Sequence, residues 1–113
     1  MEWRVKAIRG ATTASENTEE AIAIALTELL QELEYRNRLD PDLIVSVIFT
    51  ATQDLDAVFP AKIARQIRPD WQDVALMDVQ QMHVEGSLPR CIRFLIHANL
   101  PVDTKVYQNL VER

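Results

Sequence analysis

Arg93 stands inside the apolar run 91–96, and this placement limits the possible folds more than any other feature of the chain. A guanidinium held in an apolar strand needs a paired anion, because a buried charge without a partner is very costly. No acidic residue lies near Arg93 in the sequence, so the partner is either a distant carboxylate or an anionic ligand. We favour the ligand, since arginine binds carboxylates through two parallel hydrogen bonds. The alternatives are an internal salt bridge and an edge strand that faces water.

Two further groups of cations come earlier in the chain. Arg9 ends an apolar strand, and Lys62 and Arg65 lie in the first turns of a helix that Pro60 begins. Free backbone N–H groups and the positive end of a helix bind carboxylate or phosphate, and Lys62 adds a full charge. From the residues alone, the simpler alternatives are a solvated strand end for Arg9 and an ordinary amphipathic helix for the other two.

Hydrophobic periodicity divides the chain into strands and helices. We expect strands over 3–11, 43–51, 74–79 and 90–98, a helix that starts within 15–20 and runs to about 37, a second helix over 60–67, and an ambiguous tail over 104–113 that forms at most a short last strand. This order predicts a single α+β domain spanning 1–113, with a mixed sheet and helices packed on one face. Two helices leave the other face bare, and a trimer or similar oligomer would cover it.

The charge and the cysteine content limit the classes of partner. A net charge of −5 and a pI near 4.9 argue against a nucleic-acid binder, which normally presents a basic face. An anionic substrate must therefore be attracted by a local group of cations and not by the field of the whole molecule. Cys91 is the only cysteine, which excludes an intrachain disulfide and a cysteine-based zinc site.

The sequence also predicts where the protein resides. The N-terminal segment 1–6 lacks the apolar core and the cleavage site of a signal peptide. The longest apolar run, 21–26, falls far short of the roughly 18 residues that a membrane span requires. We therefore expect a soluble, cytoplasmic protein with no membrane partner.

The motifs of the common catalytic classes are missing from this sequence. It contains no Gly-x-Ser-x-Gly, phosphate loop, dinucleotide-binding fingerprint or His-Glu-x-x-His. His83 and His97 have no motif partners, and Asp54 and Asp56 are too few for a calcium loop and are interpreted as solvated. We expect neither a metal nor a cofactor. A cationic pocket without an evident base suits a reaction catalysed by electrostatics and substrate shape.

Four segments, in order and within about residues 3–98, resemble the AroH-type chorismate mutases: 8–13, 50–52, 54–62 and 86–93. The third segment, with its Phe-Pro-Ala-Lys, is the most specific of them. The resemblance implies a homotrimer that forms a pseudo-α/β barrel, with active sites in clefts between subunits. It also implies conversion of chorismate to prephenate in phenylalanine and tyrosine biosynthesis, a pericyclic rearrangement that uses no cofactor.

The resemblance assigns roles to individual positions. Arg93 would be the central cation, reaching the ether oxygen and a carboxylate of the substrate, while Arg9 would hold a carboxylate and Tyr107 would contact the substrate nearby. The adjacent subunit would complete the cleft with Phe59, Ala61, Lys62 and Arg65, and the opposite wall would consist of Met77, Asp78, Val79, Gln80 and Gln81.

Gln81 and the tail depart from the family pattern. The family usually has glutamate at Gln81, where it hydrogen-bonds the ring hydroxyl and balances the arginine. We expect Asp78 to supply the displaced negative charge and Gln81 to keep a hydrogen bond; the alternative is that Gln81 suffices and Asp78 is a surface acid. The chain stops at Arg113, before the Arg-Pro-containing tail of the family, so we expect either weaker closure of the site or a truncated chain.

Two other functions compete with the mutase. One is a trimeric binding or regulatory module that holds a small carboxylate without turning it over. The other is a trimeric small-molecule deaminase of similar overall shape, against which the Phe-Pro-Ala-Lys context argues. Arg9, Lys62 and Arg93 together favour the enzyme, since a pure binder would need fewer of these cations.

Overall fold

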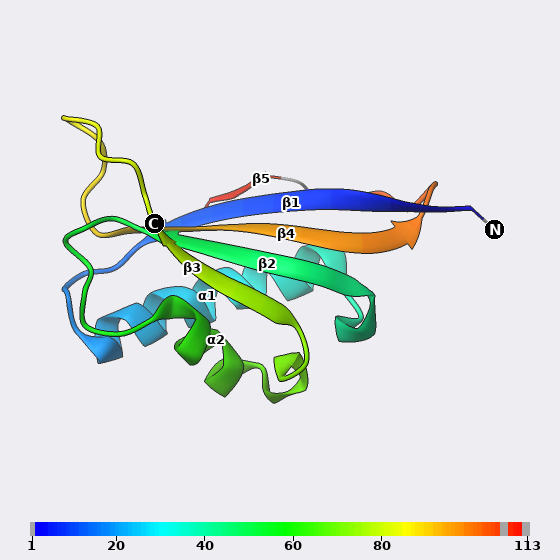
Figure 1. Cartoon of the computed structure of the whole chain (residues 1–113), viewed down its shortest axis with the longest axis horizontal. Helices are drawn as coiled ribbons and strands as arrows, with labels where there is room; N and C mark the ends of the chain where they lie inside the picture. Colours follow the sequence, from blue (N-terminus) through cyan, green and yellow to red (C-terminus); the bar gives the residue numbers. More distant parts are fainter. Residues whose placement is uncertain (1, 107–108, 112–113) are drawn as a thin grey trace.

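The computed structural model describes residues 2–106 and 109–111, the last three by their backbone alone (Figure 1). Its elements are β1 (Trp3–Thr13), α1 (Glu19–Asn37), β2 (Ile44–Ala51), α2 (Pro60–Ile67), β3 (Ala75–Gln80), β4 (Cys91–Pro101) and β5 (Asn109–Val111), with short 3-10 turns at Pro41–Leu43 and Pro69–Trp71. The five strands form one sheet in the order β3-β2-β4-β1-β5.

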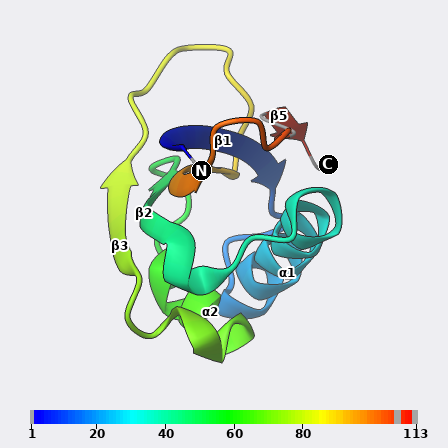
Figure 2. The ribbon, with the colours of Figure 1, turned by 90° about the vertical axis from the view of Figure 1, so that its right-hand side faces the viewer.

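The sheet is mixed. β4 pairs antiparallel with both β1 and β2, whereas β3 runs parallel to β2 and β5 runs parallel to β1. Both helices lie on the same side of the sheet, as the two views show (Figures 1 and 2). The predicted α+β fold, with a mixed sheet and helices on one face, is therefore confirmed.

The two longest strands extend further than their sequence pattern predicts. β1 and β4 pair over their whole lengths, from Trp3 opposite Pro101 to Thr13 opposite Cys91. Pairing carries β4 past its predicted end near residue 98, because a proline is tolerated at the end of a strand. This long antiparallel pair forms the middle of the sheet and carries both of its candidate catalytic arginines.

The helix α1 begins where its capping chemistry places it. The Thr18 hydroxyl accepts a hydrogen bond from the Ala21 N–H at 3.1 Å, and Glu19 and Glu20 occupy the first turn, where the helix dipole favours acids. The helix ends at Asn37, as predicted, with Arg38 in the left-handed conformation. Its apolar stripe then faces the sheet.

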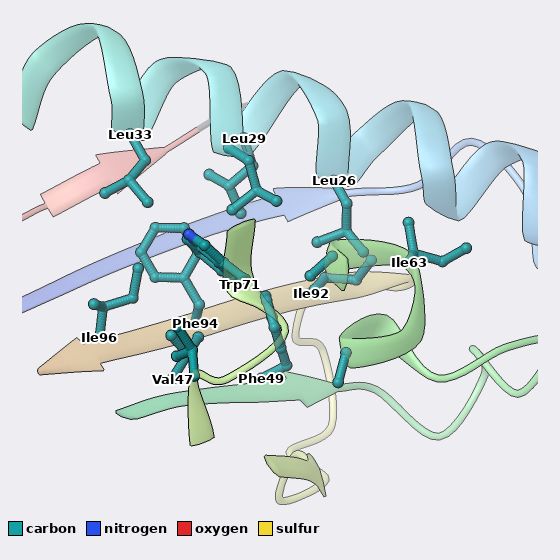
Figure 3. Packing of buried hydrophobic residues seen from close by; sticks show 14 of the residues in the cluster. Leu26, Leu29, Leu33, Val47, Phe49, Ile63, Trp71, Ile92, Phe94 and Ile96 are labelled. Carbon is teal, nitrogen blue, oxygen red and sulfur yellow. The ribbon is translucent and has the colours of Figure 1, made fainter. Parts of the chain in front are cut away.

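The hydrophobic core fills the space between the sheet and the helices (Figure 3). Leu26, Leu29 and Leu33 of α1 pack over the sheet, to which β2 contributes Phe49 and β4 contributes Phe94. Phe49 is fully buried, so its replacement by alanine should cost about 3–5 kcal/mol of unfolding free energy. The core thus holds the helix-covered face of the sheet rigidly.

The opposite face of the sheet is bare in the single chain. Alternate residues at the start of β1 and along β3 are apolar and exposed. The exposed fractions are 50% for Trp3, 55% for Val5, 60% for Met77 and 43% for Val79. Successive side chains of a strand point to opposite faces, so these four residues lie on the side without helices. We call this side the open face.

Candidate active site

The open face carries two arginines close together in the sheet. Arg93 lies in β4 between Ile92 and Phe94, which are buried in the core, so the guanidinium projects from the open face and is exposed. Arg9 lies in β1 and pairs with Leu95, two residues from Arg93 on the same face. The two are diagonal neighbours across the antiparallel ladder, with Cβ atoms separated by somewhat less than about 7–8 Å. Two adjacent cations on one face favour a ligand with two negative charges.

Two buried polar side-chain atoms lack partners among the described residues, one on β2 next to Arg93 and one just after β3. Thr50 of β2 lies directly opposite Arg93 on one side and beside Val79 on the other. Gln81 follows β3 immediately, and its N–H donates to the Ala51 carbonyl at 2.8 Å. The Thr50 Oγ1 and the Gln81 Oε1 are buried and have no hydrogen-bond partner within the described part of the chain. Such atoms are costly to leave unsatisfied, which marks this region as one that receives a ligand or another chain.

A second group of predicted residues gathers at the start of α2. Pro60 occupies the first turn, and Phe59 precedes it with no side-chain cap. The missing cap comes from β3, where the Asp78 Oδ1 accepts a hydrogen bond from the Ala61 N–H at 3.0 Å. Because an acceptor at a helix N-terminus satisfies a free N–H group and the helix dipole, Asp78 fixes where α2 begins. Lys62 is the next residue and is exposed.

Two grooves meet at this helix start. The larger, of about 690 Å³, is lined by Phe59, Ala61, Lys62, Arg65, Gln66, Pro69, Gln72 and Asp78. The smaller, of about 510 Å³, runs along the loop before α2 and the end of β3, and its walls include Val79 and Gln80. Phe59, Lys62 and Asp78 line both grooves. Phe59 is 69% exposed and lines both grooves, so its ring is available to contact a ligand.

The environment of Asp78 alters its acidity. Its partial burial removes water from the carboxylate and raises the pKa of this carboxyl, while the Ala61 N–H and the charge of Arg65 act in the opposite direction. Arg65 itself donates to the Val74 carbonyl at 3.3 Å, which holds its side chain along the groove. A titratable group with a perturbed pKa in a groove is a candidate functional residue.

The loop before α2 is fastened at its first end by Asp54. Both carboxylate oxygens accept the Arg90 N–H, at 2.9 and 3.1 Å, and the Thr52 hydroxyl donates to the same carboxylate. The Thr52 hydrogen bond is the main cause of the lowered pKa of Asp54. The sequence-based interpretation of Asp54 and Asp56 as merely solvated therefore needs correction, since both are exposed and yet hydrogen-bonded. The Thr-x-Asp spacing over 52–54 is the local signal that could have indicated the first of these contacts.

The predicted site residues fall into two sets within one chain. Arg9, Arg93 and the end of β3 at Gln81 belong to the open face. Asp78 pairs with the buried Phe49 and binds α2, so it lies on the helix-covered side with Phe59, Ala61, Lys62 and Arg65. Tyr107 lies outside the described residues. One copy of the chain therefore contains two half-sites on opposite sides of the sheet, and the charge of Asp78 does not face Arg93 of the same copy.

The described residues contain no group of three or more histidine, cysteine or acidic side chains arranged to hold a metal ion. None of the described helices is both long and apolar enough to span a membrane.

Comparison with known proteins supports one family. The family described as Chorismate mutase type I matches residues 5–112. The chain is 39% identical to a chorismate mutase AroH of Bacillus subtilis over 101 residues, covering 88% of this chain and 79% of the relative. It is 45% identical to a chorismate mutase AroH of Thermus thermophilus over 92 residues, covering 80% and 74%.

A solved structure agrees with these sequence relatives. A chorismate mutase from Clostridium thermocellum superposes with a TM-score of 0.83 at 45% sequence identity, covering 93% of this chain and 92% of the other. The chain therefore belongs to the type I chorismate mutase family.

Proposed function

We propose that this protein converts chorismate into prephenate, at the branch toward phenylalanine and tyrosine. Its membership of the family and its relatives named chorismate mutase support this activity. Chorismate is a dianion, and its rearrangement is a unimolecular shift that requires neither a nucleophile nor a proton transfer. The enzyme has to hold the compact conformer of the substrate and stabilise the negative charge that grows on the ether oxygen.

Arg93 is the residue placed best to stabilise that charge. It is planar, permanently charged and able to reach two oxygens at once, so one guanidinium can contact the ether oxygen and a carboxylate together. Arg9, its diagonal neighbour, would hold a substrate carboxylate. Tyr107 would contact the substrate in the same region, as the resemblance implies.

The separation of the two half-sites is the observation that supports an active site shared between two copies of the chain. Arg9 and Arg93 lie on the open face, whereas Lys62 and Phe59 lie at the start of α2 on the other side of the sheet. A complete cationic cleft therefore requires the α2 start of one copy to approach the open face of another. The exposed apolar side chains of the open face favour such an approach, and a closed trimer satisfies every copy equally.

The acids and amides of the cleft would then come from two copies. Gln81 would stay beside Arg93 and hydrogen-bond the ring hydroxyl, while Asp78 would arrive with Lys62 from the neighbouring copy and supply the balancing negative charge. Met77, Val79 and Gln80 would line the wall between the two. We propose that this assembly works in the cytoplasm, where a soluble biosynthetic enzyme meets its substrate.

The activity is tested by incubating the purified protein with chorismate, following the loss of its ultraviolet absorbance and the appearance of prephenate. Turnover is the expected result. A folded protein that binds chorismate without turning it over would overturn the proposal and favour the non-catalytic carboxylate-binding module.

The shared site is tested by mixing two inactive variants. Arg93→Ala and Lys62→Ala, each almost inactive alone, are unfolded together at equal concentration and refolded. If each site takes Arg93 from one copy and Lys62 from the next, about a quarter of the sites in a closed ring regain both cations. No recovery of activity in the mixture, with ring assembly intact, would place both cations of each site in one copy.

A further inference from the structure

Residues 52–59 form a loop without regular secondary structure, which leads into α2 and lines the smaller groove. Its first end is held by Asp54, and the helix that follows is held by Asp78 through the Ala61 N–H. Between these two anchors, the loop contacts the link between β1 and α1 at Asn17. Leu55 and Ile63 anchor the loop and the helix in the core, and the Thr52 N–H donates to the Cys91 carbonyl at 3.0 Å. The exposed middle of the loop, around Asp56 and Ala57, is held by the side chain of Asn17.

Asn17 makes three hydrogen bonds to the middle of this loop. Its Oδ1 accepts from the Asp56 N–H at 3.0 Å and from the Ala57 N–H at 3.1 Å. Its Nδ2 donates to the Asp56 carboxylate at 2.6 Å. One amide thus satisfies two backbone donors and one carboxylate, across 39 and 40 residues of chain. Because an amide has one accepting and one donating end, few other side chains can make this set of contacts.

We propose that Asn17 is a positioning residue that holds the loop 52–59 so that Phe59 and Lys62 meet the substrate. This inference rests on the proposed mutase activity for its functional consequence, but not for the contact itself. Asn17 touches neither groove, so it acts only through the loop.

Because the Asn17 contact is exposed, its loss should affect function more than the unfolding free energy. Asn17, Asp56 and Ala57 are all exposed, so water replaces the lost hydrogen bonds and the unfolding free energy changes little. The loop, however, gains freedom that substrate binding must then remove. Binding residues displaced by even a fraction of an ångström lose much of their contribution, so the effect falls on function and not on folding.

The first experiment compares Asn17→Ala with Glu16→Ala, the exposed neighbouring residue. We expect Asn17→Ala to raise the KM for chorismate roughly ten-fold and to lower kcat by less, because ordering of the binding loop is what is lost. The melting temperature should stay within a few degrees of the wild type. Glu16→Ala should leave both KM and kcat unchanged.

The second readout does not depend on activity. The Asp56 and Ala57 amides donate to Asn17, so their hydrogen exchange should accelerate in Asn17→Ala and not in Glu16→Ala. Unchanged exchange at both amides would overturn the inference, whatever the kinetics. Faster exchange with an unchanged KM would show that the hydrogen bonds exist but that Asn17 does not position the loop for the substrate. If the wild type proves inactive on chorismate, the proposed function fails and the exchange still tests the contact.

A swap of the two side chains gives the sharpest control. Asn17→Asp keeps the acceptor for both N–H groups but places two carboxylates against each other, so KM should rise. The double variant Asn17→Asp with Asp56→Asn restores one carboxylate and one amide in exchanged places. Return of KM toward the wild type supports the inference, and a double variant as poor as Asn17→Asp contradicts it.

Discussion

The two half-sites are held in place by different means. Arg93 sits in the middle of β4, which is hydrogen-bonded to β1 on one side and to β2 on the other. The start of α2 packs into the core through Ile63 and Ala64, and the hydrogen bonds that tie it and its loop to the rest of the chain come from the side chains of Asp78, Asn17 and Asp54. Backbone ladders do not depend on the identity of individual residues, whereas each of these three contacts depends on one side chain. The strand that carries Arg93 is thus held by its backbone, whereas the proposed substrate-binding group at the start of α2 depends on individual side chains.

This difference has a physical reason. Electrostatic stabilisation requires a donor that is already in place when the charge develops, and the centre of a sheet provides that. A substrate-binding loop must admit and release its ligand, so it is held by contacts of modest energy. Substitutions on the strands should therefore affect the chemical step, and those around α2 should affect substrate binding or stability.

The largest effect is expected at Arg93. Arg93→Ala should lower kcat/KM by about 10³-fold or more, because it removes the charge that we propose meets the ether oxygen. Arg93→Lys should remain strongly impaired, since a single ammonium cannot make two parallel contacts. Steady-state kinetics with chorismate measure both. Arg4→Ala, an exposed arginine near the other end of β1, is the matched control. Near-normal activity of Arg93→Lys would show that charge alone suffices.

The next effect separates Asp78 from Gln81. Asp78→Asn should cost far more activity than Gln81→Ala, by about 10²-fold, if the cleft needs its negative charge. Asparagine keeps an acceptor oxygen for the Ala61 N–H, so this variant removes the charge while retaining the helix cap. Circular dichroism and the melting temperature check that α2 survives. Equally small losses in both variants would contradict the charge role.

Asp78 should also be visible in the pH profile. Burial raises its pKa above the usual 3.8, so the carboxylate takes up a proton at a higher pH than an exposed aspartate. If the charge is needed, kcat/KM falls as the pH decreases through this raised value. Asp78→Asn should lack this acidic limb. An acidic limb of the same midpoint in both proteins would assign the titration to another group.

A smaller effect is expected at Phe59. Phe59→Ala removes an exposed aromatic ring from both grooves and should raise KM roughly ten-fold with little change in kcat. Tyr35→Ala, which removes a strongly exposed ring from α1, should change neither parameter. A fall in kcat without a change in KM would show that Phe59 acts in the chemical step and not in substrate binding.

The smallest effect is on stability, at Asp54. Its pKa lies below the usual 3.8, so the native state favours the carboxylate and gains stability above pH 3.8. That contribution is lost as the pH falls through the lowered pKa. Asp54→Asn should therefore lower the unfolding free energy slightly near neutral pH, because solvent screens an exposed carboxylate, and by almost nothing in strong acid. Urea unfolding across this pH range measures the difference, and a cost independent of pH would contradict it.

Much of the architecture follows from local patterns in the sequence. Apolar periodicity, the cap at Thr18 and the helix-starting Pro60 place the helices and most strand bounds within a few residues of those observed. Alternation around Arg93 places Ile92 and Phe94 together on one face of β4, whereas the exposure of Arg93 in the single chain is seen only in the structure. These features depend on residues a few positions apart, which is why the sequence alone contains them.

The assembly of each half-site was decided by the tertiary structure. The bond from Ala61 to Asp78 joins residues 17 positions apart, and that from Asn17 to Asp56 joins residues 39 apart. No periodicity encodes such pairs, because they arise only after the helices have docked on the sheet. The placement of Asp78 opposite to Arg93 across the sheet likewise depends on strand register. The sequence by itself determined the elements and the charged residues of the site, and the packing of those elements determined which residues act together.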